Sequence, residues 1–317
     1  MKLLKLVPDH TNLNFMRWRN LALVLSLIAT VASISFTIYR GLNLGIDFVG
    51  GEVVRVQFVQ PVPIEDLRAR VDRLGIGEAS PTSLGKDNRT YQIRLPKPPG
   101  PETASNAMVS KLRVTLPQQY PGAKVDSGES VSGKVSEELA ADSAKAIGIA
   151  MIGIAIYIWF RFEWQFGVGA LLTLAHDIAM TLGFFAFTRL PVDLNVVAAF
   201  LTIIGYSLND TVVIYDRIRE NLRKYRKMSI LPLLNLSLNE TLARTVVTSL
   251  TVLIALGVLM LIGPRVIFGL AIAIFLGVVI GTYSSIYISS PVLVWLGVQP
   301  DSFLKSEDKE GAEAQTA

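Results

Sequence analysis

Six stretches of this sequence are long, apolar and almost free of charged residues. Their expected bounds are 21–39, 140–160, 166–187, 195–215, 244–262 and 266–288. Each is close to the roughly 20 residues that an α-helix needs to cross the hydrocarbon core of a bilayer. Hydrophobic residues make up 51% of the 317 positions, which is high for an ordinary soluble protein. The sequence therefore predicts a polytopic α-helical membrane protein with six transmembrane helices.

The first stretch could also be interpreted as a cleaved signal peptide. Its 19 uncharged residues, Leu21–Tyr39, exceed the apolar core of a normal signal peptide. Arg40 follows them, in place of a clear cleavage site made of small residues. We therefore expect the first stretch to remain as a membrane span.

Lysine and arginine residues are distributed unevenly among the short segments that join the spans. Residues 1–20 contain four and residues 217–244 contain seven, whereas 188–194 and 263–265 contain one each. Because cytoplasmic segments carry the excess of Lys and Arg, both termini are predicted to be cytoplasmic, with residues 40–139 on the opposite side. The expected cytoplasmic segments are 1–20, 216–243 and 289–317.

The segment between the first two spans has the pattern of a small α+β domain. Its strands and helices are expected at 52–59, 64–74, 81–84, 90–95, 102–116 and 123–131. The order β-α-β-β-α-β is that of a ferredoxin-like domain. Residues 41–140 include 12 basic residues, 12 acidic residues and no histidine. This balance gives no electrostatic footprint for nucleic acid, and no nucleophile–base pair marks the domain as catalytic.

Asp210 interrupts the fourth apolar stretch, well inside its predicted end. A charge at the centre of a membrane helix costs about 2.5–3.5 kcal/mol of insertion free energy. At helical spacing Asp210 shares one side of the helix with Asn195, Tyr206 and Asn209. A structural hydrogen bond between packed helices is one interpretation. We favour the other, a route for ions or protons, because intramembrane acids are rare and usually line such routes.

Three further ionisable residues lie in or beside the predicted spans. His176 and Asp177 are neighbours inside the third stretch, where hydrogen bonds between helices and a proton relay explain them about equally well. Arg244 opens the fifth stretch, on the same predicted cytoplasmic half of the bundle as Asp210. A direct or water-linked pair between Arg244 and Asp210 would lower the cost of both charges.

A glycine-framed string follows the first span. Gly45, Gly50 and Gly51 bracket Asp47 directly before the first predicted strand. Glycine permits a positive φ or a close backbone approach, so a tight junction between span and strand explains the string more simply than a ligand site. The chain contains no cysteine and no Walker A string. Thiol catalysis, Cys-ligated metals and direct ATP hydrolysis are therefore not predicted, and no cofactor or metal is expected.

Four strings carry a resemblance to a known family. They are GIDFVGG at 45–51, RFEWQFGVGALLTLAHD at 161–177, NVVAAFLTIIGYSLNDTVVIYDRIREN at 195–221 and NETLARTVVTSLT at 239–251. In these strings the chain resembles the SecD/SecF family of protein-export membrane subunits, a branch of the resistance–nodulation–division superfamily. In layout the resemblance covers all but the tails of the chain.

The resemblance implies an accessory, non-enzymatic subunit of the bacterial inner membrane, with residues 40–139 in the periplasm. Such a subunit assists Sec-dependent translocation and uses the proton motive force to complete export after the ATP-driven step. The implied partners are SecD, the SecYEG channel with YajC and YidC, the unfolded precursor protein, the lipid membrane and protons. The resemblance also assigns proton coupling to Asp210, with Arg244 as its charge partner, and a hinge role to the motif around Asp47.

The residues alone leave two other functions open. One is a half-transporter that moves small solutes or ions with the same proton machinery. The other is a non-conducting scaffold whose polar residues only lock the helices together.

Overall fold

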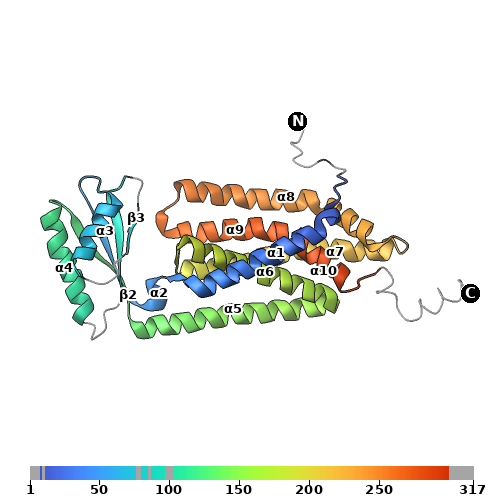
Figure 1. The fold of residues 1–317 in the computed structure, drawn as a ribbon, viewed down its shortest axis with the longest axis horizontal. Helices are drawn as coiled ribbons and strands as arrows, with labels where there is room; N and C mark the ends of the chain where they lie inside the picture. Colours follow the sequence, from blue (N-terminus) through green and yellow to red (C-terminus); the bar gives the residue numbers. More distant parts are fainter. Residues whose placement is uncertain (1–7, 9–10, 76–79, 85–86, 97–102, 300–317) are drawn as a thin grey trace, which may run out of the picture.

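The computed structural model of this chain describes residue 8 and residues 11–75, 80–84, 87–96 and 103–299. A bundle of long helices makes up most of it, with a small α+β domain at one end of the bundle (Figure 1). The turn expected at 85–88 and the proline-rich break expected at 96–101 lie partly outside the described residues, and the tail from Asp301 lies wholly outside them.

Six helices of the described chain are long and apolar enough to cross a membrane, which confirms the predicted architecture. They are α1 (Arg19–Arg40), α5 (Gly133–Arg161), α6 (Trp164–Thr188), α7 (Leu194–Lys224), α8 (Ile230–Ile262) and α9 (Phe268–Ser284). A short helix, η1 (Phe15–Trp18), leads into α1. Large apolar side chains such as Leu27, Ile28 and Ile149 stay exposed on α1 and α5, as expected for surfaces that face lipid.

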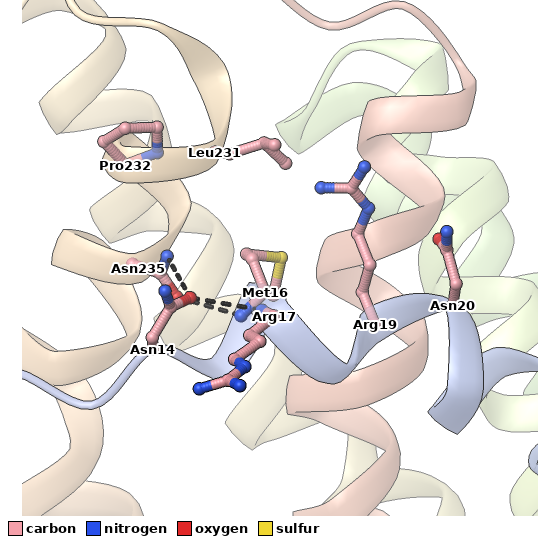
Figure 2. Close-up of a pocket in the computed structure, with 8 residues that line it drawn as sticks. All are labelled: Asn14, Met16, Arg17, Arg19, Asn20, Leu231, Pro232 and Asn235. Atoms are coloured by element: carbon pink, nitrogen blue, oxygen red, sulfur yellow. Dashed lines mark hydrogen bonds between the residues drawn. The ribbon is translucent and has the colours of Figure 1, made fainter.

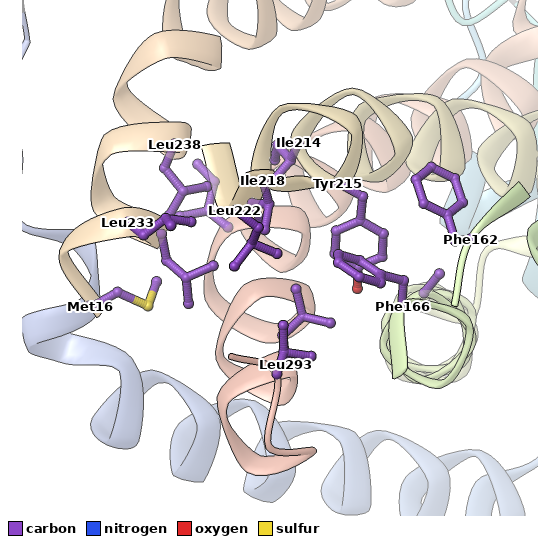
Figure 3. Close-up of a cluster of buried hydrophobic side chains, with 14 of the residues drawn as sticks. Met16, Phe162, Phe166, Ile214, Tyr215, Ile218, Leu222, Leu233, Leu238 and Leu293 are labelled. Atoms are coloured by element: carbon purple, nitrogen blue, oxygen red, sulfur yellow. The ribbon is translucent and has the colours of Figure 1, made fainter. Parts of the chain in front are cut away.

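The segment 216–243, predicted to be cytoplasmic with a surface-lying helix at 229–242, is mostly helical. α7 continues to Lys224, and α8 begins at Ile230. The start of α8 belongs to the core: Leu233 and Leu234 are fully buried in one hydrophobic cluster with residues of α7 (Figure 3). Because this packing removes apolar surface from water, it favours a continuous helix over a loop at these positions.

The sixth span ends later than the predicted residue 288. α9 passes through a π-helical turn, η3 (Ser285–Ser289), into α10 (Ser290–Trp295). Pro291 closely follows the π-turn, and because it has no N–H, it cannot donate a helical hydrogen bond to the carbonyls of that turn. A π-turn places one extra residue in a helix and is frequently found at functional sites.

The small α+β domain, which we call the external domain because it lies outside the helix bundle (Figure 1), has the predicted element order. Its elements are β2 (Gly51–Gln57), α3 (Ile64–Arg73), β3 (Ser80–Ser83), β4 (Thr90–Pro96), α4 (Thr103–Gln119) and β5 (Lys124–Val131). The strands form one antiparallel sheet in the order β3-β4-β2-β5, as in a ferredoxin-like domain. Figure 1 shows α3 and α4 on the side of the sheet away from the bundle. Side chains from both layers form the core, including Val54, Val56, Leu67, Tyr91, Ile93, Leu112 and Leu116.

Two connections join the external domain to the bundle. β5 leads into α5, which begins at Gly133, ahead of the predicted residue 140, because the Ser132 hydroxyl caps the helix by accepting from the Val135 N–H. At the other connection β1 (Asn43–Leu44) pairs in parallel with β6 (Pro191–Val192), the short segment between α6 and α7. The chain that leaves the first span is thus hydrogen-bonded to the start of α7.

Aromatic and aliphatic side chains fill the end of the bundle where α7 meets α8 (Figure 3). The ring of Tyr215 packs edge-on against Phe166 and Phe162, with centroids 5.0 and 6.0 Å away. Edge-to-face pairs of this kind contribute about 0.5–1.5 kcal/mol beyond their buried area. This cluster packs the C-terminal half of α7 against the start of α6 and against Phe162, which caps the C-terminal end of α5.

The N-terminal segment is held against the start of α8 by two asparagines. The Met16 N–H donates to the Asn235 Oδ1 at 3.0 Å, and the Leu13 N–H donates to the Asn239 Oδ1 at 2.9 Å. A pocket of about 490 Å³ lies beside this contact and is lined by Arg17 and Arg19 among others (Figure 2). Both asparagines of α8 therefore accept hydrogen bonds from the backbone of the N-terminal segment.

The close contact between α7 and α9 depends on Gly277. A Cβ at this position would overlap the Ile203 side chain, which is buried, so Gly277→Ala is expected to cost about 1–3 kcal/mol through overpacking. Gly257→Ala is the matched control, because a Cβ there meets nothing within 4 Å. Thermal unfolding of the purified chain should show a lower midpoint for Gly277→Ala only, and equal midpoints would contradict the packing.

Candidate functional site

Asp210 lies in the interior of the bundle, where three helices meet. Its side chain is only 7% exposed. Oδ1 accepts a hydrogen bond from the Thr245 hydroxyl of α8 at 2.7 Å, and Oδ2 accepts one from the Ser285 hydroxyl at the start of the π-turn at 3.0 Å. Both carboxyl oxygens are thus hydrogen-bonded, as a buried acid requires. The carboxyl group links α7 to α8 and to the end of α9.

Asp177 is a second acid in the interior, and it is completely buried. Its Oδ2 accepts hydrogen bonds from the Ser207 hydroxyl of α7 at 2.5 Å and from the Ser284 hydroxyl of α9 at 2.9 Å. Its Oδ1 lies 2.9 Å from Nδ1 of His176, whose ring is also buried. Asp177 therefore joins α6 to α7 and α9.

The two acids are brought together by consecutive residues of the sixth span. Ser284 donates to Asp177, and Ser285 donates to Asp210. Both serines are fully buried at the point where α9 enters the π-turn. Sequence reasoning missed these serines, together with Thr245 and Ser207. The signal available in the sequence was the cluster of hydroxyl residues in GTYSSIYISS at 281–290, inside the long uncharged run.

Arg244 does not pair with Asp210 in this structure. It is exposed on α8, one residue before Thr245, and no ion pair joins it to Asp210 among the described residues. The two groups interact electrostatically without direct contact. The role of Arg244 as the charge partner of Asp210 therefore stays a prediction.

The other predicted polar residues of α7 do not gather around Asp210. The Tyr206 hydroxyl donates to Ser249 at 3.2 Å, which in turn lies 2.8 Å from the Thr282 hydroxyl. Asn209 is exposed on the outside of the bundle, and Asn195 is exposed at the start of α7. The reason is the rotation of the helix: its buried face carries mainly apolar residues and small hydroxyls on either side of Asp210.

The string GIDFVGG binds the start of α7. The Gly45 N–H donates to the Val192 carbonyl at 2.7 Å, and an Oδ2 of Asp47 accepts from the Leu194 N–H at 3.0 Å. Asp47 thereby satisfies one of the free N–H groups at the N-terminus of α7, where negative charge is also stabilised. Gly50 and Gly51 have φ of +74° and +132°, which a side chain would strain. The predicted tight junction is present, and it is tied to the helix that carries Asp210.

Arg94 of β4 interacts electrostatically with the same point from the external domain. Burial lowers the pKa of Arg94, and the nearby carboxylates of Asp193 and Asp47 act in the opposite direction. Burial raises the pKa of Asp193, whose Oδ1 accepts from the Val196 N–H at the N-cap of α7. One arginine of the sheet therefore lies beside two acids that hold the start of α7.

No group of three His, Asp or Glu residues able to hold a metal ion occurs in the part of the chain that the structure describes. Among the described residues of the bundle, the buried polar side chains are those of Asp177, Asp210, His176 and Asn221, together with hydroxyl groups. Six apolar helices around this interior, with a ferredoxin-like domain outside, define a multi-pass membrane protein with an ionisable core.

Comparison with protein families identifies the group to which this architecture belongs. Residues 113–299 match the model "Protein export membrane protein SecD/SecF, C-terminal", and residues 40–62 match the "SecD/SecF GG Motif". The chain belongs to the SecD/SecF family.

Relatives of known name match over nearly the whole chain. The protein translocase subunit SecF of Rhodobacter capsulatus is 38% identical, over 98% of this chain and 98% of the relative. The SecF subunit of Rickettsia rickettsii is 40% identical, over 92% of this chain and 94% of its own length. That of Vibrio alginolyticus is 38% identical over 98% of both chains.

Solved structures of SecDF have the same fold. The crystal structure of SecDF from Thermus thermophilus, described as a translocon-associated membrane protein, superposes with a TM-score of 0.81 at 33% identity. That alignment covers 92% of this chain and 39% of the SecDF chain. A SecDF structure in a "super-membrane-facing form" gives a TM-score of 0.67 at 32% identity, over 97% of this chain and 40% of the other.

The contact between Asp47 and α7 predicts a local effect on the helix start. Asp47→Ala removes the acceptor of the Leu194 N–H and is expected to cost about 0.5–2 kcal/mol, as loss of a helix cap does. Asp47→Asn keeps an oxygen acceptor and serves as the matched control. Hydrogen exchange at the Leu194 amide should become faster in Asp47→Ala and much less so in Asp47→Asn. Unchanged exchange in both variants would show that the hydrogen bond does not hold the helix.

Proposed function

We propose that this chain is a SecF-type subunit which, together with SecD, assists the export of unfolded precursor proteins across the bacterial inner membrane. We further propose that the proton motive force drives this step through reversible protonation of Asp210. Membership of the SecD/SecF family and the SecF relatives support the role in translocation. Because the chain aligns with 39% of a SecDF chain, SecD is the expected source of the remaining membrane helices.

The observation that carries the proton-coupling proposal is the nature of the partners of Asp210. Thr245 and Ser285 are neutral hydroxyls, and a hydroxyl can donate to a carboxylate or accept from a carboxylic acid. The site can therefore satisfy the hydrogen bonds of Asp210 in either protonation state. An arginine in direct contact would hold the acid in its ionised form, and Arg244 is not in that position here.

The available driving force is adequate for such a step. Moving one elementary charge through the membrane potential releases about 2.3 kcal/mol per 100 mV. Arg244, exposed one residue before Thr245, is placed to approach Asp210 if α8 shifts during the cycle. In this proposal the chain is an accessory subunit and not an enzyme. SecYEG provides the channel, YajC and YidC are further partners, and neither a cofactor nor nucleic acid takes part.

A single substitution tests the proton coupling. Asp210→Asn is nearly isosteric but cannot ionise, so it should assemble in the membrane yet reduce export in vesicles to the level measured without a proton gradient. Asp216→Asn is the matched control, because Asp216 lies on the same helix and pairs with Arg161 at an exposed site. Full proton-driven export by Asp210→Asn would contradict the proposal and favour a scaffold.

A second experiment tests contact with the exported polypeptide. β5 is an edge strand of the external sheet, and an edge offers unpaired backbone groups to an extended chain. Because the chain has no cysteine, a single Lys124→Cys on β5 gives one defined crosslinking site. It should crosslink to a translocating precursor more strongly than Val114→Cys on the exposed side of α4. Absence of any crosslink in the domain would favour transport of small solutes instead.

A further inference from the structure

We propose that Asp177 and His176 form a second proton-binding site, which is coupled to Asp210 through the adjacent hydroxyls of Ser284 and Ser285. This inference rests on the proposed function, because it assigns a second titrating group to the same proton-driven bundle. It starts from the three hydrogen-bond partners of Asp177, which come from α6, α7 and α9.

The charge balance around Asp177 requires a proton. Asp177 is completely buried, and the interiors of α1 and α9 carry no charged residue. The ionisable groups near it are His176 on the same helix and Asp210 on α7; Arg244 on α8 is exposed. With one proton, the His176–Asp177 pair is neutral overall, either as an ion pair or as two uncharged groups. Without that proton it would leave a net negative charge in the membrane interior, which is costly.

The geometry lets this proton be exchanged. His176 Nδ1 and Asp177 Oδ1 are 2.9 Å apart, so a proton can be held by either group. Ser207 and Ser284 reach the other carboxyl oxygen, and their hydroxyls can reverse between donor and acceptor roles. When the pair releases one proton and Asp210 takes one up, the total charge of the interior is unchanged.

The link to Asp210 is the π-turn of the sixth span. Ser284 and Ser285 are consecutive, so a change in the backbone at this turn alters the hydrogen bonds of both acids at once. Two buried hydroxyls have no hydrogen-bond partner among the described residues: that of Thr211, the residue after Asp210, and that of Ser290, the residue after the π-turn. An unpaired buried hydroxyl is costly, and its presence is expected where hydrogen bonds are exchanged between two states.

Infrared difference spectroscopy on the full chain in lipid bilayers tests the inference directly. A pH titration should reveal two titrating bands in the unmodified chain: the carboxylic-acid carbonyl band of Asp210, and a carboxylic-acid or imidazolium band of the Asp177–His176 pair. Asp177→Asn should remove one band, and Asp210→Asn should remove the other. In each variant the midpoint of the remaining band should move to lower pH by about one pH unit, because a coupled acid of like charge is lost.

Two serine variants separate coupling from a purely structural role. Ser284→Ala removes one donor to Asp177 and should shift the frequency of the Asp177 band without abolishing it. Ser249→Ala is the matched control, because this buried hydroxyl contacts Tyr206 and Thr282 and neither acid. It should leave both bands unchanged.

The outcomes distinguish this inference from the proposed function. A titrating band of Asp210 with no titrating band assigned to Asp177 or His176 would overturn the inference and leave proton coupling at Asp210 intact. Two bands whose midpoints do not influence each other would overturn the coupling. If no band titrates at all, both proposals are wrong.

Discussion

The structure depends on how a bundle of apolar helices compensates acidic side chains in its interior. Both buried acids are held by hydroxyl groups: Thr245 and Ser285 for Asp210, and Ser207 and Ser284 for Asp177, which also contacts His176. A cation in contact would lower the energy of the ionised acid alone. Hydroxyl groups stabilise either form, so the same packing is compatible with the charged and the neutral state. The core is therefore stable without fixing the charge of its acids.

Such hydroxyl contacts require helices that approach closely, and α9 provides this with small residues. Gly277 lies against Ile203, and a Cβ on Gly281 would come within 3.3 Å of the Ser207 Cβ. Because these glycines remove side-chain bulk, α7 and α9 approach closely enough for short side chains to bridge them. The π-turn then presents two consecutive serines to two different acids. The sixth span thus supplies both the glycines that let α7 and α9 pack closely and the serines that bind the two buried acids.

The sequence was sufficient for the features set by local pattern and insufficient for those set by packing. Uncharged runs gave the six spans, and alternating patterns gave the order of the ferredoxin-like sheet. The buried face of α7 could not be predicted, because polar residues stand on both sides of Asp210 and polarity alone does not show which is buried. Asn209, predicted on the polar side with Asp210, is exposed, whereas Thr211 is buried. The π-turn at Ser285–Ser289 leaves no signature in an apolar run. The partner of Asp47 lies far along the chain, at Leu194, and only the fold brings them together.

α7 connects the external domain to the buried acids. Its first residues are held by Asp47, and Arg94 of the external sheet lies beside this contact. Asp210 lies on the same helix, about 24 Å from Leu194 at 1.5 Å per residue. A helix transmits a displacement along its length, so under the proposed function the position of the external domain and the protonation of Asp210 are linked. Linkage is reciprocal: a polypeptide load that displaces the domain must change the proton affinity of the core by the same free energy with which protonation displaces the domain.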